Sequence, residues 1–141
     1  MSRTKLVLVV SVGLFIVLQL IPLNQNNPPV IQAVNAPAEI QKILKTSCFD
    51  CHSNETVWPW YSRIAPASFL ITHDVNDGRK HLNFSDFSEM DAFDSTDVAE
   101  EIIEALEDGK MPLPPYLMLH PDARLSDSQV KALISWAKTL Y

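Results

Sequence analysis

Cysteine is scarce in this chain: its 141 residues include only two, Cys48 and Cys51. Both stand in one short run, so no second pair is left to form a structural disulfide. A scaffold stabilised by disulfides is therefore excluded. The folded part must draw its stability from an apolar core and from any group that the two thiols hold.

Basic residues are also in short supply. The chain has 17 acidic residues against 11 basic ones, for a net charge of −6. Two of the bases, Arg3 and Lys5, stand at the N-terminus, so the remainder is more negative still. This balance disfavours nucleic acid and anionic lipid surfaces as partners and favours a protein with a basic docking face. Ordinary solubility would account for the same charge.

One long apolar run covers Leu6–Leu23, interrupted at Ser11, Gly13, Gln19 and Pro22. As a helix its 18 positions would span about 27 Å, close to the hydrocarbon thickness of a bilayer. Because Arg3 and Lys5 precede the run, the positive-inside rule places the N-terminus in the cytoplasm and the rest outside it. No good cleavage site follows. We therefore expect an uncleaved anchor, a transmembrane helix within residues 1–23, in the bacterial inner membrane, with the rest on the periplasmic side.

The region after the apolar run divides into two parts. Residues 24–37 are polar and rich in proline, which predicts an extended tether. The folded domain is then expected over residues 38–141. No segment of it shows the alternation of a strand, so we expect an all-α domain. Apolar residues at helical spacing predict helices at about 38–45, 67–82, 97–108 and 126–140.

Local signals mark the ends of two of these helices. Ser126 and Gln129 form a capping box at the start of the last one, and Gly109 is the expected stop of the helix before it. Inside the helix at 67–82, Gly78 weakens the prediction because glycine lowers helix propensity. The apolar faces expected to pack inward are Ile40, Ile43 and Leu44; Val98, Ile102, Ile103 and Leu106; and Val130, Leu133, Ile134, Ala137 and Leu140, with Trp136 beside the last face.

The two cysteines belong to the run Cys48-Phe49-Asp50-Cys51-His52, which is C-x-x-C-H, the attachment signature of c-type haem. Thiols at this spacing add to the two vinyl groups of one porphyrin, and the adjacent histidine ligates its iron. A redox disulfide would follow a strand, but here a predicted helix precedes the run. A structural zinc site needs four ligands, and the other histidines form no second ligand pair: His73, His81 and His120. One covalent haem c is the favoured interpretation.

Met111 is the best candidate for the sixth iron ligand. It follows the helix stop at Gly109 and precedes Pro112-Leu113-Pro114-Pro115-Tyr116, a loop whose prolines fix φ and so favour a weak iron–sulfur bond. A Met/His pair raises the potential, whereas filling the core is the other role that a methionine takes. Of the remaining groups, Met118, His120 and His73 are rival ligands, and Met90 in an acidic stretch is expected to be exposed.

Three aromatic residues follow the haem signature closely: Trp58, Trp60 and Tyr61. We expect some of them to pack on the porphyrin edge, with an indole N–H or the Tyr61 hydroxyl reaching a propionate. The other interpretation is that they are ordinary core residues and that the nearby bases are solvated. The cations available for the propionates are Arg79, Lys80 and Arg63.

Further stretches complete a pattern that covers nearly the whole predicted exported part: Trp58-Pro59-Trp60-Tyr61, Ile64-Ala65-Pro66, His73-Asp74-Val75 with Gly78-Arg79, Leu82-Asn83-Phe84-Ser85, Gly109-Lys110-Met111-Pro112 with Tyr116, and His120-Pro121 with Leu125-Ser126. By these stretches and the C-x-x-C-H run, the chain resembles the bacterial haem-binding domain family of membrane-anchored, single-haem proteins. The order of its helices also resembles a class I cytochrome c. The resemblance implies haem binding and a cytochrome c-like fold in which the two end helices cross and pack beside the haem.

The ligand set determines which function is favoured. A haem whose two axial positions are filled by protein does not bind substrate readily, so it exchanges electrons. The sequence therefore predicts a non-enzymatic, membrane-anchored electron carrier whose partners are redox proteins or a respiratory membrane complex. Two alternatives stay open: a haem sensor or peroxidase-like protein with an open sixth site, and an accessory haem subunit of such a complex.

Overall fold

The computed structural model describes residues 1–87 and 92–140. No strand occurs in these ranges, and the one extended pairing there is an isolated bridge between Gln32 and Asp86. The all-α prediction is therefore confirmed. The elements are α1 (Arg3–Gln19), α2 (Ala38–Ser47), α3 (Phe49–His52), η1 (Trp60–Arg63), α4 (Ala67–His81), α5 (Ala92–Glu107), α6 (Pro114–Leu119), η2 (Pro121–Ala123) and α7 (Asp127–Ala137), with η denoting short 3₁₀ helices.

The four predicted helices correspond to α2, α4, α5 and α7, although α5 begins five residues before the predicted start at Asp97. The capping box is present, because the Ser126 side chain accepts from the Gln129 backbone and the Gln129 side chain accepts from the Ser126 backbone. Gly109 has a φ of 63°, the left-handed conformation that ends a helix, and the next N–H, of Lys110, donates to the Ala105 carbonyl at 2.9 Å.

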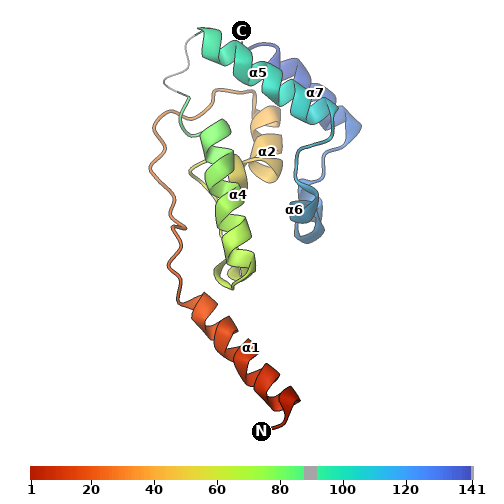
Figure 1. Cartoon of the computed structure of the whole chain (residues 1–141). Helices are drawn as coiled ribbons and strands as arrows, with labels where there is room; N and C mark the ends of the chain where they lie inside the picture. The colour runs from red at the N-terminus through yellow and green to blue at the C-terminus, as the bar shows by residue number, and fades with distance from the viewer. Residues whose placement is uncertain (88–91, 141) are drawn as a thin grey trace.

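The core lies where α2, α5 and α7 meet, and Figure 1 shows α5 and α7 side by side. Leu44 of α2 and Leu133 of α7 are almost completely buried there. Trp136 is also buried, whereas the sequence placed it beside the apolar face. It packs against Phe84, with ring centroids 6.4 Å apart, and Phe84 stacks on Phe49 of α3. This aromatic group connects the terminal helix to the haem signature.

Residues 20–37, which we call the strap, are extended, but they are not free of the domain. Val34 and Ala36 belong to the hydrophobic core, and the Val34 N–H donates to the Phe84 carbonyl at 2.8 Å. The N–H groups of Ile31 and Gln32, also in the strap, both donate to the Ser85 carbonyl. The strap therefore packs on the domain in addition to connecting it with α1. Val34 and Ala36 are its two buried residues, whereas Val30 and Ile31 stay exposed.

Helix α1 extends away from the rest of the molecule, as Figure 1 shows, and none of its residues is buried. It has 17 residues and ends at Gln19. Pro22 disfavours helical geometry at the residue before it, Ile21, and so limits the length of the helix. Over the described ranges, no helix has both the length and the hydropathy needed to cross a membrane. The predicted transmembrane helix is thus not supported.

The C-terminal end of α1 is docked on the domain. The Gln19 side chain accepts from the Ala65 N–H at 3.0 Å and donates to the Ala65 carbonyl at 3.4 Å. Gln25, a little further along the strap, donates to the Ser62 carbonyl and to the Thr72 hydroxyl. These bonds fix the start of the strap against η1 and α4.

Candidate haem site

The main chain of α4 fixes the imidazole of His52. Its Nδ1 lies 3.0 Å from the Gly78 carbonyl oxygen and 3.2 Å from that of Leu82. Carbonyl oxygens only accept, so Nδ1 carries the proton and donates to both. Burial lowers the pKa of His52, against the opposing effect of the two carbonyls, and so favours the neutral ring. Nε2 is then left with a lone pair, which is the form that ligates iron.

Gly78 is what allows α4 to approach the haem signature so closely. A Cβ at this position would lie 2.6 Å from the Cys51 carbonyl oxygen and 3.1 Å from its carbonyl carbon. Both atoms are backbone, so a larger residue would force α3 and α4 apart. The sequence marked Gly78 only as a weakness of the helix. A glycine in the middle of an otherwise good helix is the signal from which this contact could have been inferred.

The two cysteines are half-buried and unpaired. Burial raises the pKa of Cys48 to about 12 and that of Cys51 to about 11. Reactive redox cysteines show the opposite shift, because a lowered pKa supplies their thiolate. A dithiol–disulfide catalyst is therefore disfavoured. The described part of the chain holds no group of three or more His, Cys, Asp or Glu side chains placed to bind a metal ion.

Two adjoining cavities, of about 170 and 340 Å³, open beside the signature. They share five wall residues: Cys48, His52, His81, Leu106 and Met111. The smaller is almost wholly apolar, and its other walls include Leu44, Leu82, Phe84, Val98, Ile102, Ala105 and Leu133. The larger is more polar and is also lined by Cys51 and by the carboxylates of Asp50, Asp74 and Asp77.

This donor set fits a c-type haem. Both thiols, an imidazole with a free Nε2 and a thioether sulfur border the two adjoining cavities, as covalent attachment and ligation of a haem require. His81 is a wall residue that sequence reasoning missed, because it lies next to His52 only through the packing of α4.

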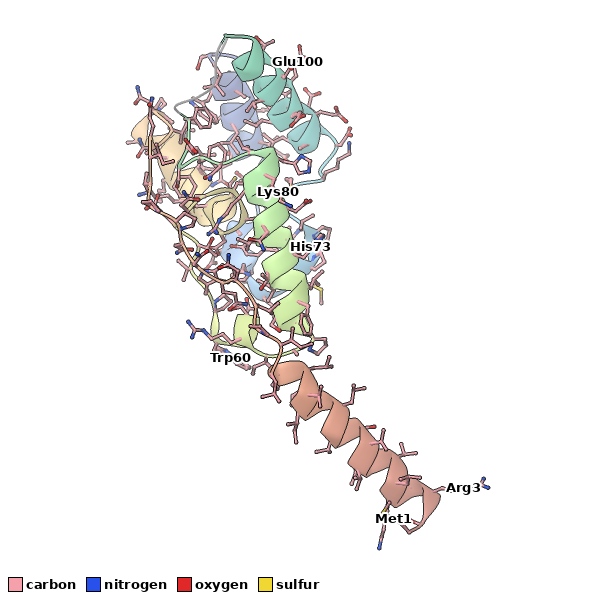
Figure 2. The ribbon with its side chains drawn as sticks, turned by 60° about the vertical axis from the view of Figure 1, so that its left-hand side comes forward. Met1, Arg3, Trp60, His73, Lys80 and Glu100 are labelled. Carbon is pink, nitrogen blue, oxygen red and sulfur yellow. The ribbon has the colours of Figure 1, made fainter. Side chains whose placement is uncertain are left out.

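Of the candidate sixth ligands, Met111 is the one that the structure brings to the cavities shared with His52. Met118 is 82 % exposed, and His73 is exposed on α4 (Figure 2). His120 has both ring nitrogens in hydrogen bonds, described below. Met90 lies outside the described residues. The axial role of Met111 remains a prediction, with rivals that point elsewhere.

A chain of hydrogen bonds links the loop after Met111 to the haem signature. The Tyr116 hydroxyl donates to Asp50 Oδ2 at 2.8 Å. Nδ1 of His120 donates to the Tyr116 carbonyl at 3.1 Å, because that oxygen only accepts. Nε2 of His120 in its neutral form then accepts from the Tyr61 hydroxyl, also at 3.1 Å. The rings of Tyr116 and His120 are stacked with centroids 4.0 Å apart.

The other predicted haem-edge aromatics lie elsewhere. Trp60 is 76 % exposed and sits at the end of the domain next to α1 (Figure 2). The Trp58 indole donates to Asn27 of the strap at 3.1 Å. Neither lines the two cavities. Tyr61 lines a third cavity, of about 190 Å³, which shares Asp50, Cys51, Asp74, Leu113 and Tyr116 with the larger of the two.

Arg79, the predicted propionate partner, is engaged by the protein itself. Its Nε donates to the Ser53 carbonyl at 2.7 Å, and its Nη atoms donate to the strap and to Thr56. The strap acceptors are the Asn26 carbonyl and Asn27 Oδ1, both at 2.9 Å. The guanidinium therefore joins α4, the turn after His52 and the strap. The two other predicted cations, Lys80 and Arg63, are exposed and do not line the two cavities.

Comparison with known protein families gives a match over most of the chain. The family described as "Haem-binding domain" matches residues 13–139 of the chain. No curated protein and no solved structure matches it.

Proposed function

Because the chain belongs to the haem-binding domain family, we propose that it is a c-type cytochrome in which Cys48 and Cys51 hold one haem covalently. The observation that carries this proposal is the tautomer of His52, whose Nδ1–H is taken up by two carbonyls while Nε2 is left free. His52 is then the first axial ligand and Met111 the second. When bound, the haem supplies a one-electron redox centre.

The surrounding residues hold and tune these ligands. The carbonyls of Gly78 and Leu82 orient the His52 ring and, by accepting hydrogen bonds from its Nδ1–H, raise the basicity of Nε2 as a ligand. Leu44, Phe84 and Leu133 form an apolar wall that excludes water on one side of the site. The thioether of a methionine is a weak ligand, so its place depends on how well the loop is held.

Electron transfer is the activity that this arrangement supports best. Two axial ligands from the protein leave no position for a substrate, so the site exchanges electrons with another protein rather than catalysing a reaction. Asp74 and Asp77 border the cavity next to Cys51. They favour a redox partner, alone or within a respiratory membrane complex, whose docking face is basic.

A haem sensor or peroxidase-like protein is the second candidate. The observation that favours it is the exposure of Met111, which is 38 % accessible and therefore within reach of a competing ligand. His73 offers no acid–base group near the site, because it is exposed and does not line the cavities. An accessory haem subunit would share the electron-transfer chemistry of the first proposal.

The test is to mature the full chain with covalent haem and compare Met111→Leu with Met118→Leu, which makes the same change at a residue far more exposed. We expect Met111→Leu to lower the reduction potential and to bind carbon monoxide, and Met118→Leu to behave as the wild type. Equal behaviour of the two variants would remove Met111 as a ligand. Tight binding of carbon monoxide by the wild type would favour the sensor.

We also propose that the protein is attached to the bacterial inner membrane with its haem site on the periplasmic side. The apolar side chains of α1 are exposed on every side of the helix, and Arg3 and Lys5 stand before them. Cell fractionation with an alkaline wash, followed by protease treatment of spheroplasts, tests both parts. Recovery in the soluble fraction, or protection from the protease, would contradict the proposal.

A further inference from the structure

The position of Met111 is set at two points of the chain. Upstream, the N–H groups of Lys110 and Met111 both donate to the Ala105 carbonyl, at 2.9 and 3.3 Å, which ties the residue to the end of α5. Downstream, three prolines at 112, 114 and 115 fix φ along the short connection to Tyr116. A stiff connection transmits the position of Tyr116 to Met111.

Tyr116 is itself held by the haem signature. Its hydroxyl donates to Asp50, which stands between the two cysteines, and Asp50 is fixed in turn because its Oδ1 accepts from the Val57 N–H at 2.9 Å. Hydrogen bonds to a carboxylate are about twice as strong as neutral ones. The pKa of Tyr116 is raised, first by burial and then by this bond, so the hydroxyl keeps the proton that it donates.

The other side of Tyr116 is supported by His120. The stacked imidazole donates to the Tyr116 carbonyl and accepts from Tyr61 of η1. The phenol ring of Tyr116 therefore packs against His120, while its hydroxyl binds Asp50. This arrangement accounts for a histidine that does not line the two cavities shared with His52.

We propose that the Tyr116–Asp50 hydrogen bond is a latch that holds Met111 at the cavity it shares with His52. Tyr116 and Asp50 are positioning residues in this proposal, which depends on the assignment of Met111 as the sixth ligand. The latch joins the loop of the sixth ligand to the segment that carries the covalent attachments and the first ligand. With the latch broken, the loop loses its bond to the segment that carries the two cysteines and keeps only its ties to α5 and His120, so the sixth position becomes easier for external ligands to reach.

The experiment measures imidazole binding to the oxidised, haem-loaded full chain. Tyr116→Phe keeps the ring stacked on His120 and removes only the donor, and Asp50→Asn removes the carboxylate from the other partner. We expect each to tighten imidazole binding about ten- to hundredfold and to weaken the red absorption band of methionine–iron ligation. The double variant should go little further than the larger single effect, because both single changes act on the same Tyr116–Asp50 pair.

Tyr61→Phe is the matched control, since it removes a phenolic hydroxyl that donates to His120 and not to the signature. Its effect should stay within about fivefold. Thermal unfolding of all variants separates the latch from general loss of stability. If Tyr116→Phe and Asp50→Asn bind imidazole no more tightly than Tyr61→Phe, the latch is overturned while Met111 stays the proposed ligand. If the wild type lacks the methionine band, both fall together.

Discussion

The change from Gly78 to alanine tests how closely α4 must approach the haem signature. The added Cβ would meet the Cys51 carbonyl oxygen at 2.6 Å, whereas ordinary contact begins at 3.4 Å. The two backbones must therefore separate by about 0.8 Å, because neither atom belongs to a flexible side chain. That movement stretches the bonds from His52 Nδ1, now 3.0 and 3.2 Å long, beyond the range of a good hydrogen bond.

The energetic terms can be weighed against one another. Forcing a methyl group into a packed contact costs about 1–3 kcal/mol, and losing a hydrogen bond from a buried ring costs about 1 kcal/mol more. Alanine returns about 1 kcal/mol through its better helix propensity. The net expectation is a destabilisation of about 2 kcal/mol, or roughly 5–10 °C in Tm for a domain of this size. Without these hydrogen bonds, Nε2 of His52 donates its electron pair to the iron more weakly. The oxidised iron is then less stabilised, so the reduction potential should rise.

Thermal unfolding and potentiometry of the haem-loaded protein measure the two effects. The control is Gly13→Ala, because Gly13 lies in α1 and an added Cβ there meets nothing within 4 Å. If Gly78→Ala matched Gly13→Ala in both Tm and potential, the close approach of α4 would have no role in holding His52, and the reasoning would be refuted.

Four further substitutions test other parts of the structure. Cys48→Ser and Cys51→Ser should each leave one thioether bond to the haem, visible as altered pyridine haemochrome spectra, and a spectrum identical to the wild type would count against covalent attachment. Arg79→Lys should lower the free energy of unfolding by about 1–3 kcal/mol, since a lysine cannot make the forked contacts of the guanidinium. It should leave the reduction potential unchanged. A shifted potential with an unchanged Tm would instead favour a role of Arg79 as partner of a haem propionate. Burial raises the pKa of Asp74 above its unfolded value, an effect partly opposed by His73. The ionised carboxylate is therefore disfavoured in the folded state, and this penalty is present above the folded pKa and absent below the unfolded one. Asp74→Asn should be more stable than the wild type at neutral pH and lose that advantage in acid, as pH-dependent unfolding would show; an advantage that grew in acid would contradict this sign.

The parts of the fold that the sequence predicted are those specified by neighbouring residues. The capping box at Ser126 and the glycine at 109 mark helix ends, because caps act within one turn. The C-x-x-C-H run carries its own chemistry in five positions. The apolar spacing of α2 likewise needs no knowledge of partners. Each of these signals is local, so reading along the chain was enough to find it.

What the sequence did not predict depends on contacts between distant segments. Arg79 was a reasonable propionate partner by charge, yet its four acceptors lie 23 to 53 positions earlier in the chain. The burial of Val34 depends on Phe84, and the orientation of His52 depends on carbonyls that follow it by 26 and 30 positions. Carbonyl groups are present in every residue, so no pattern of side chains announces such partners. The exposure of Trp60 has no local signal either.

The strap has a consequence for the order in which the protein assembles. It precedes the haem signature in the chain, yet apart from local bonds with Gln41 its hydrogen-bond partners within the domain, from Asn54 to Phe87, follow that signature. In a chain that is synthesised from its N-terminus, most hydrogen bonds of the strap therefore form only once α4 and the residues after it are present. Docking of the strap is thus a late step in the folding of the domain.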